Sequence, residues 1–419
     1  MNARDVFADL IAANRAGARR GIPSWCTAHP ETLSTILGAF RDSEEPILIE
    51  ATCNQVNQDG GYTGMTPADF RGFVEGLAQK AGVDPTRLIL GGDHLGPNPW
   101  RRLSAREAMA RACDLTKAFV EAGFAKIHLD ASMACGDETH VAEATIAERA
   151  AALCAAAESV GARDACIYVI GTEVPIPGGE LEPLDALAVT APEAARRTYD
   201  LHRAAFAARG VATALERVVA LVVQPGVDMG NNQVFDYDAG KAARLSAAVA
   251  EIPGVVYEAH STDYQTEAAL GDLVASHFAI LKVGPMLTFA FREAVFALAA
   301  IEDQLKPVSP SGIVAALEHA MDARPGDWRG YVAADGAERV TRLFGLSDRI
   351  RYYWPQPQVQ SALRRLFANI DAARTSLGLI SQFAGDMLRE RREPSLSQRV
   401  VAAKVEAVVE RYRRACGAR

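Results

Sequence analysis

Short apolar runs alternate along the chain with longer stretches in which apolar and polar residues recur at helical spacing. The runs have the length and composition of buried strands, and nearly all of them end in a reactive or metal-capable side chain. They cover residues 22–29, 46–54, 88–94, 126–132, 166–173, 219–224, 255–260 and 278–282. Eight strands separated by helix-length spacers predict an α/β fold, the (β/α)8 TIM barrel, in which catalytic groups lie at the C-terminal ends of the strands.

The spacers contain the start signals of helices. Thr66 stands before Pro67, which places a capping hydroxyl ahead of a proline at the first helical position. Ser104 and Glu107 have the spacing of a capping box. Alanine-rich spacers predict further outer helices at residues 142–160, 192–209 and 240–250.

The pattern changes after the last apolar run. Helical periodicity continues without a convincing strand, at residues 292–305, 312–321, 340–344, 358–371 and 395–411. We therefore predict a barrel over residues 1–300 and a helical C-terminal unit over residues 301–419 that packs on it. Residues 347–355 mix arginines with aromatic side chains. This mixture favours a docking surface between the two parts over a substrate-binding role.

Composition narrows the classes of partner. The 419 residues are 49% hydrophobic and carry a formal net charge of −8, with no block of basic residues. Neither nucleic acid nor an anionic membrane surface is favoured by such a charge. The seven cysteines are odd in number and include no Cys-x-x-Cys pair, which is typical of a reduced protein. With no apolar leader or membrane-length run, we expect a cytoplasmic protein.

Strand alternation directs several polar side chains into the barrel or its mouth. In the second run Glu50 and Asn54 share a face, in the fourth His128 and Asp130 do, and in the seventh His260 follows Glu258 at the same parity. Burying this much unpaired polarity would cost several kcal/mol. A ligand, a metal or a hydrogen-bonded network is therefore expected to satisfy it.

The sharpest local pattern is the segment 91–97, Gly-Gly-Asp-His-Leu-Gly-Pro. Its glycines let the backbone open, so Asp93 and His94 emerge together at a strand end. Asp93 can act as a general acid or base, and His94 can bind a metal. With Glu173 and His260 it would form a His/Glu/His set with an open position, as catalytic zinc sites require. The alternative is that both histidines belong to a hydrogen-bonded network.

A phosphate site is predicted after the last two strands, where barrels often hold phosphate. The candidate residues are Ser261, Thr262, Lys282 and Gly284. The alternative for the lysine is a salt bridge across the mouth to Glu258 or Glu173. The amide-rich and glycine-rich loop 53–64 could bind sugar hydroxyls or form an Asx-turn loop. The sequence contains neither a P-loop nor a dinucleotide fingerprint, so nucleotide chemistry is unsupported.

Long motifs in these same regions resemble the GatZ/KbaZ family. They lie at residues 49–58, 60–70, 90–98, 126–133, 168–175, 257–265 and 347–355. The resemblance implies a barrel related to the class II, metal-dependent sugar-bisphosphate aldolases and a place in tagatose and galactitol catabolism. Some family members are accessory subunits of D-tagatose-1,6-bisphosphate aldolase, and others are D-tagatose-6-phosphate 4-epimerases. Members are also labelled tagatose-6-phosphate kinases.

The resemblance also implies residue roles. Asp93 corresponds to the proton-transfer residue of class II aldolases, His94 and His260 to metal ligands, and Glu173 to the acidic residue near the metal. Gln224 stands where class II aldolases have a metal-binding histidine, and the segment 261–264 replaces their glycine-rich phosphate loop. The predicted catalytic residues are Asp93, Asp130 and Glu173, and the predicted metal ligands are His94, Glu173 and His260. The predicted substrate-binding residues are Glu50, Asn54, His128, Gln224, Ser261, Thr262, Lys282 and Gly284.

From these observations we predict a 4-epimerase that interconverts D-tagatose 6-phosphate and D-fructose 6-phosphate by retro-aldol cleavage with a divalent metal, zinc by preference. The alternative is a non-catalytic subunit that stabilises a class II aldolase. The kinase function is disfavoured because the sequence has no nucleotide motif. The expected partners are a phosphorylated ketohexose, a class II aldolase subunit and further copies of the chain.

Overall fold

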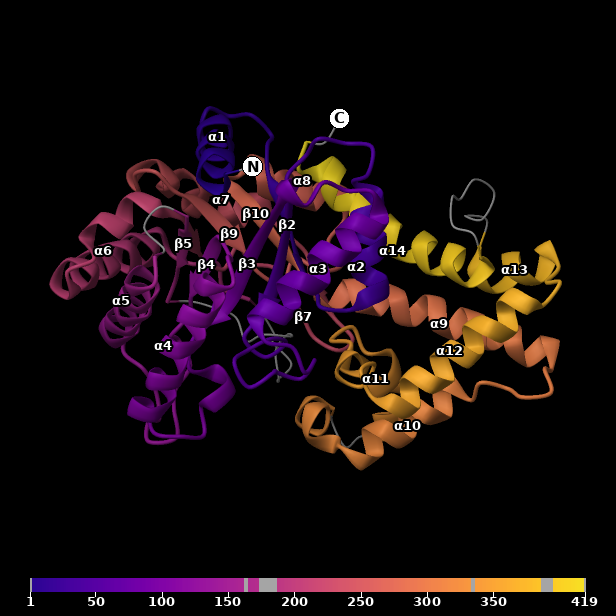
Figure 1. The fold of residues 1–419 in the computed structure, drawn as a ribbon. Helices are drawn as coiled ribbons and strands as arrows, with labels where there is room; N and C mark the ends of the chain where they lie inside the picture. The colour runs from indigo at the N-terminus through magenta and orange to yellow at the C-terminus, as the bar shows by residue number, and fades with distance from the viewer. Residues whose placement is uncertain (1, 162–164, 173–186, 333–335, 386–394, 418–419) are drawn as a thin grey trace.

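A computed structural model describes residues 2–161, 165–172, 187–332, 336–385 and 395–417 (Figure 1). Eight parallel strands close into a barrel in the order β1-β10-β9-β6-β5-β4-β3-β2. The predicted TIM barrel is therefore confirmed, and each strand overlaps one of the predicted runs. The strands are β1 (Ile22–Cys26), β2 (Ile47–Thr52), β3 (Leu88–Leu95), β4 (Lys126–Leu129), β5 (Ile167–Ile170), β6 (Val218–Val222), β9 (Val256–Ala259) and β10 (Phe278–Val283).

Helices cover the outside of the barrel, as each spacer predicts. The Thr66 hydroxyl accepts the Asp69 N–H, and the Asp69 carboxylate accepts the Thr66 N–H, which completes a capping box. Ser104 accepts the Glu107 N–H, while the Glu107 carboxylate accepts the Ser104 hydroxyl. The helices are α2 (Pro30–Ala39), α3 (Pro67–Ala81), α4 (Ala105–Glu121), α5 (Glu143–Ser159), α6 (Pro192–Arg209), α7 (Ala239–Ala248) and α8 (Glu267–Ala275).

An N-terminal helix, α1 (Ala3–Arg15), closes the bottom of the barrel. Its buried residues Phe7 and Leu10 share one apolar cluster with inward-facing residues of the strands, among them Leu48, Ile89 and Ile280. The sequence pattern did not predict this helix. Because the N-terminal end of the barrel is filled with apolar side chains, polar groups are confined to its other end.

After β10 the chain runs through α9 (Pro285–Leu305) into an arm of helices beside the barrel (Figure 1). Residue 300, where the sequence prediction divides the chain, lies inside α9. The last helix returns to the barrel and packs along α2, α8 and α9. The other helices of the arm are α10 (Ile313–Ala323), α11 (Glu338–Phe344), α12 (Pro357–Ala372), α13 (Leu377–Ala384) and α14 (Leu396–Ala415).

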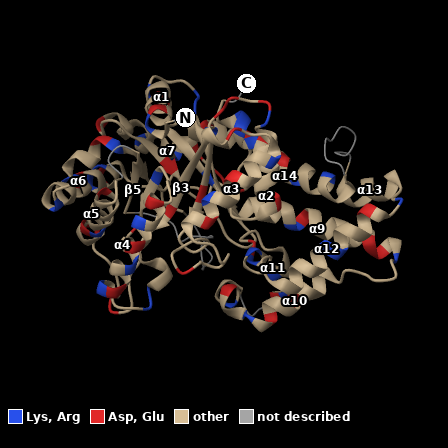
Figure 2. Ribbon diagram, viewed as in Figure 1, with Lys and Arg blue, Asp and Glu red and all other residues tan. Residues whose placement is uncertain are grey.

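A short antiparallel pair, β7 (Asp228–Met229) and β8 (Val234–Phe235), follows β6 and was not predicted. Acidic and basic residues are interspersed over the outer helices (Figure 2). None of the described helices combines the length and the apolar character that a membrane span requires.

Candidate active site

A network of buried ion pairs between lysines and carboxylates, here called the ladder, lies in the half of the barrel near the C-terminal ends of the strands. At its base the Lys126 ammonium lies 2.7 Å from Glu50 Oε1 and 2.8 Å from Glu258 Oε2, and all three side chains are fully buried. Burial lowers the pKa of Lys126, but the Glu258 and Glu50 carboxylates outweigh burial and raise it. The lysine therefore remains charged beneath the barrel mouth.

Lys282, on the last strand, forms the next level of the ladder. Its Nζ lies 2.7 Å from Glu50 Oε2, 2.7 Å from Asp93 Oδ1 and 3.7 Å from Glu258 Oε1. Burial acts to lower the pKa of Lys282, but these carboxylates raise it well above its ordinary value. Of the two roles considered from the sequence, the structure places this lysine in ion pairs across the barrel.

The charges do not balance. Four buried carboxylates (Glu50, Asp93, Asp130 and Glu258) face two ammonium groups, which leaves an excess of negative charge. His94 Nδ1 lies 2.8 Å from Asp130 Oδ2, and its Nε2 lies 3.6 Å from Asp93 Oδ2. Although burial lowers the pKa of His94, the Asp93 and Asp130 carboxylates raise it overall. The mouth therefore favours an added proton or cation.

The backbone of β3 is shaped to bring these groups together. A Cβ at Gly91 would lie 2.6 Å from Glu50 Cγ, and one at Gly96 would lie 1.6 Å from the Asp130 carbonyl oxygen. Only glycine permits both approaches. Between them His94 has a φ of +50°, an unusual conformation for a residue with a side chain. This turn directs its imidazole toward Asp130, whose other oxygen accepts the N–H and hydroxyl of Ser132.

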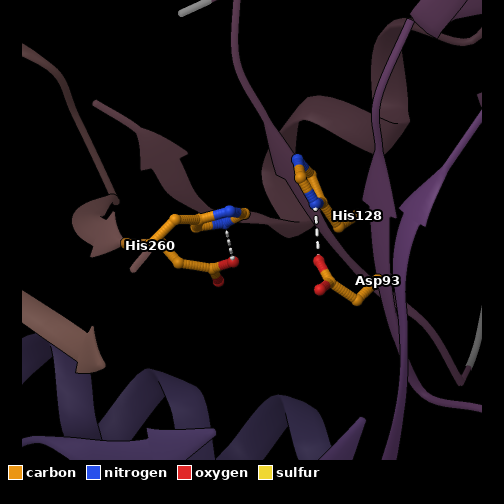
Figure 3. A group of neighbouring side chains, drawn as sticks. Asp93, His128 and His260 are labelled. Carbon is orange, nitrogen blue, oxygen red and sulfur yellow. Dashed lines mark hydrogen bonds and ion pairs between the residues drawn. The ribbon is translucent and has the colours of Figure 1, made fainter. Parts of the chain in front are cut away.

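Three histidine rings meet above the ladder, since the centroids of His94, His128 and His260 lie 4.9 to 5.2 Å apart. His128 Nδ1 lies 3.0 Å from Asp93 Oδ1, and His260 Nε2 lies 2.9 Å from Glu258 Oε1 (Figure 3). His128 Nε2 is buried without a hydrogen-bond partner. Burial lowers the pKa of His260 to about 3, which keeps this imidazole in the neutral form that binds metals.

The donor set fits a divalent metal. One ligand atom from each of Asp93, His128, Glu258 and His260 lies within 4.8 Å of the others. Two imidazoles with carboxylates suit zinc, and the unpartnered His128 nitrogen and the excess of negative charge suit any divalent cation. This group shares only His260 with the set predicted from the sequence. His94 points to Asp130 instead, and Glu173 lies outside the described residues.

A cavity of about 420 Å³ opens above the histidines. Glu50, His128 and Asp130 lie directly beneath it, in contact with residues that line it. The predicted site residues that line the cavity are Asn54, Asp93, His94, His260, Ser261, Lys282 and Gly284.

Besides Glu50 and His128, two predicted substrate-binding residues, Thr262 and Gln224, do not line this cavity. The Thr262 hydroxyl donates to the Lys282 carbonyl oxygen at 2.6 Å and faces Tyr412 instead. The Gln224 side chain caps its own turn by accepting the N–H groups of Gly226 and Val227. Both side chains make local hydrogen bonds in this structure, and their role in substrate binding stays a prediction.

Other lining residues were missed by the sequence analysis. Arg351, Tyr352 and Trp354 come from the C-terminal unit, and Tyr62 comes from the glycine-rich loop after β2. Residues 347–355 were predicted to dock the C-terminal unit on the barrel. Tyr353 and Trp354 are buried in the main core, and Arg351, Tyr352 and Trp354 line the cavity. The mixture of arginine and tyrosine in this segment marked it as functional, but the sequence analysis assigned it to docking and not also to the wall of the cavity.

Comparison with known proteins identifies the family. Residues 7–417 match the family described as D-tagatose-1,6-bisphosphate aldolase subunit GatZ/KbaZ-like. The chain belongs to the GatZ/KbaZ-like family. The resemblance seen in the sequence motifs is thereby confirmed over nearly the whole chain.

Individual members are similar at nearly full length. A D-tagatose-1,6-bisphosphate aldolase subunit GatZ from Escherichia coli is 48% identical over 416 residues, covering 97% of this chain and 99% of that protein. A GatZ subunit from Salmonella enteritidis is 47% identical, with 97% and 98% covered. A crystal structure described as a probable tagatose 6 phosphate kinase from Sinorhizobium meliloti is 46% identical, with a TM-score of 0.87, and the match covers 95% of this chain and all of that one.

Proposed function

We propose that the barrel mouth is a catalytic site that interconverts D-tagatose 6-phosphate and D-fructose 6-phosphate. The observation that carries this proposal is the buried group of Asp93, His94, His128, Glu258 and His260 beneath an open cavity. Burying so many ionisable groups is costly, and perturbed groups of this kind cluster at functional sites.

The chemistry required is a retro-aldol cleavage and its reversal. Loss of the C4 hydroxyl proton breaks the C3–C4 bond, with the bonding electrons passing to a C2–C3 enediolate. The aldehyde fragment rotates, the C3–C4 bond reforms on its other face, and the proton returns to the C4 oxygen. No ATP and no redox partner enter this sequence, so the atoms and electrons balance within the sugar phosphate.

The residues divide these tasks. Burial would raise the pKa of Asp93, but His94, Lys282 and the His128 hydrogen bond hold it well below its ordinary value, so Asp93 is ionised and able to accept the C4 proton. Lys282, whose Nζ lies 2.7 Å from Asp93 Oδ1, holds this carboxylate in position and in its ionised form. A divalent cation held by His128, Glu258 and His260 would supply a Lewis acid for the C2 carbonyl.

A second candidate function is that of an aldolase subunit. It is favoured by the relatives, since the curated proteins at 47–48% identity are named as GatZ subunits of D-tagatose-1,6-bisphosphate aldolase. These names support the subunit role more directly than they support an epimerase. In this role the chain would bind and stabilise a class II catalytic subunit. The buried charged residues would then be retained from a catalytic ancestor without taking part in catalysis.

A kinase function has less support. The similar Sinorhizobium protein is described as a probable kinase. The sequence of the present chain, however, contains no P-loop, and its glycine-rich loop at 53–64 lacks the lysine that would contact a nucleotide phosphate.

One experiment separates these functions. Purified full-length protein, loaded with zinc or another divalent metal, is incubated with D-tagatose 6-phosphate without ATP, and D-fructose 6-phosphate is followed by NMR. Product formed by the protein alone supports the epimerase. Absence of product, together with a longer lifetime or higher activity of an added class II aldolase on D-tagatose 1,6-bisphosphate, supports the subunit. ATP-dependent formation of the bisphosphate would establish the kinase.

A further inference from the structure

The C-terminal unit reaches over the barrel mouth through the short 3₁₀ turn η8 (Arg349–Tyr352). Arg351 and Tyr352 line the same cavity as Asp93, His260 and Lys282. The wall of the site is therefore made by both the barrel and the C-terminal unit, and the C-terminal unit contributes the charged side chain of Arg351.

Arg351 differs from the other basic side chain of the cavity in its charge partners. Among the described lining residues there is one lysine, Lys282, and one arginine, Arg351. Lys282 is already paired with Glu50 and Asp93, each at 2.7 Å. Arg351 makes no ion pair with a carboxylate in the part of the chain that the structure describes. The Asp348 and Asp263 carboxylates act on its charge only from beyond ion-pair distance, so Arg351 is the less neutralised of the two basic side chains and the better placed to bind an anionic ligand.

The guanidinium is held in place by neutral partners. It donates to the carbonyl oxygens of Ser347 and Asp348 and to Tyr352 Oη, the last at 3.0 Å. It also lies over the Tyr352 ring, 4.6 Å from the centroid. These partners fix the side chain without neutralising it, and a guanidinium has five N–H donors, so some remain for a ligand.

Tyr62 completes this end of the cavity. Its ring makes an edge contact with the Tyr352 ring, with centroids 4.8 Å apart, and both residues line the cavity. The nearest acidic group of the segment, Asp348, accepts the Thr288 hydroxyl with one carboxylate oxygen. Two phenols and an arginine thus lie together, apart from the carboxylates of the barrel ladder.

We propose that Arg351, with the hydroxyls of Tyr62 and Tyr352, binds the phosphate group of the sugar phosphate. This inference rests on the proposed function for the nature of the ligand. A planar guanidinium can hold two phosphate oxygens at once, and phenol hydroxyls can donate to the third. The phosphate site then lies on the C-terminal unit, and the predicted cradle around Thr262 and Lys282 is replaced, because those two side chains are used elsewhere.

Binding, not turnover, tests this site. Isothermal titration of the full-length protein measures the affinities for D-tagatose 6-phosphate and for D-tagatose. The wild-type protein is expected to prefer the phosphorylated sugar. Arg351→Gln should weaken its binding by about 10- to 100-fold, as loss of a charged hydrogen bond does, with little effect on D-tagatose. Arg351→Lys should restore part of the preference, because it keeps the charge but not the planar fork.

The control is Arg329→Gln, which removes an exposed arginine of the same unit and should leave both affinities unchanged. Melting temperatures establish that the variants are folded, and if Arg351→Gln is not, Arg351→Lys and Tyr352→Phe are compared with wild type. An unchanged preference in the folded Arg351 variants, or a wild-type protein that binds the two sugars equally, overturns the phosphate site. If the preference depends on Arg351 but no epimerisation occurs, the phosphate site stands and the epimerase proposal fails.

Discussion

Lys282 on the last strand of the barrel donates to the Asp93 carboxylate on the third strand, across a distance of 2.7 Å. The same ammonium group reaches Glu50 on the second strand. One side chain thus connects three strands at the mouth and neutralises part of the buried negative charge.

Replacing this lysine should lower the stability of the barrel. Lys282→Met keeps an apolar stem but leaves the Asp93 and Glu50 carboxylates without their shared partner. We expect the free energy of unfolding to fall by about 3–5 kcal/mol, the usual cost of breaking a buried ion pair. Urea denaturation followed by circular dichroism measures this change. Lys241→Met, on an exposed helix surface, is the matched control, and an equal effect of the two substitutions would contradict the assigned role.

Removing the charge of Asp93 should affect turnover. If Asp93 transfers the C4 proton, Asp93→Asn lowers the rate of D-fructose 6-phosphate formation by about 10²–10⁴-fold, the typical contribution of a positioned acid or base. Initial rates at saturating D-tagatose 6-phosphate measure this loss. Asp9→Asn, on the helix at the opposite end of the barrel, should retain wild-type activity. A fully active Asp93→Asn enzyme would exclude this residue as the base.

Metal analysis distinguishes two ligand sets. The structure groups His128 and His260 with Asp93 and Glu258, so His128→Ala and His260→Ala should each lose bound zinc. His94→Ala should retain it, because that imidazole is directed to Asp130. The sequence-based prediction differs, since it expects the loss in His94→Ala. Zinc content by elemental analysis decides between the sets, with the exposed His319→Ala as the control.

A buried histidine far from the mouth predicts acid sensitivity. Burial lowers the pKa of His202 to about 4, so the folded protein holds it neutral with its ring nitrogen against the Thr198 carbonyl oxygen. In the unfolded chain the pKa is about 6.5. Stability from this group is therefore complete above pH 6.5 and is lost as the pH falls toward 4, by about 3 kcal/mol at ~1.4 kcal/mol per pKa unit.

The measurement is the difference in unfolding free energy between pH 7 and pH 5. It should be smaller in His202→Gln than in the wild type, and unchanged in His319→Gln. Part of the pH dependence will remain, because burial also lowers the pKa of His29 to about 3. Identical pH dependence in His202→Gln and wild type would show that His202 is not held neutral.

The strands were predictable because each apolar run is bounded by turn or cap residues, and this signal is local. The gathering of Asp93, His94, Asp130 and His260 followed from strand parity and from the position of strand ends. The choice between His94 and His128 did not follow from parity, since both were expected at the mouth. It depends on the φ of +50° at His94, a backbone conformation that sequence spacing does not reveal.

Features that depend on long-range contacts could not be predicted. Lys126 reads as the first residue of an ordinary strand, and its role appears only when the closed barrel brings Glu50 and Glu258 to it. Arg351 is separated from the barrel residues of the cavity by several helices, so no local pattern connects them. The helix α1 was missed because its apolar residues have no partner until the N-terminal end of the barrel has formed.

The return of α14 to the barrel has a consequence for how the molecule forms. The Gly21 N–H donates to the Cys416 carbonyl oxygen, and the Tyr412 hydroxyl donates to the Thr262 carbonyl oxygen while its ring packs on Trp25. The seam between the first and last strands is therefore covered by residues that lie much later in the chain than the last strand. Such contacts between distant parts of a chain are slow to form. A nascent barrel will therefore expose this seam until α14 has been synthesised and has packed against it.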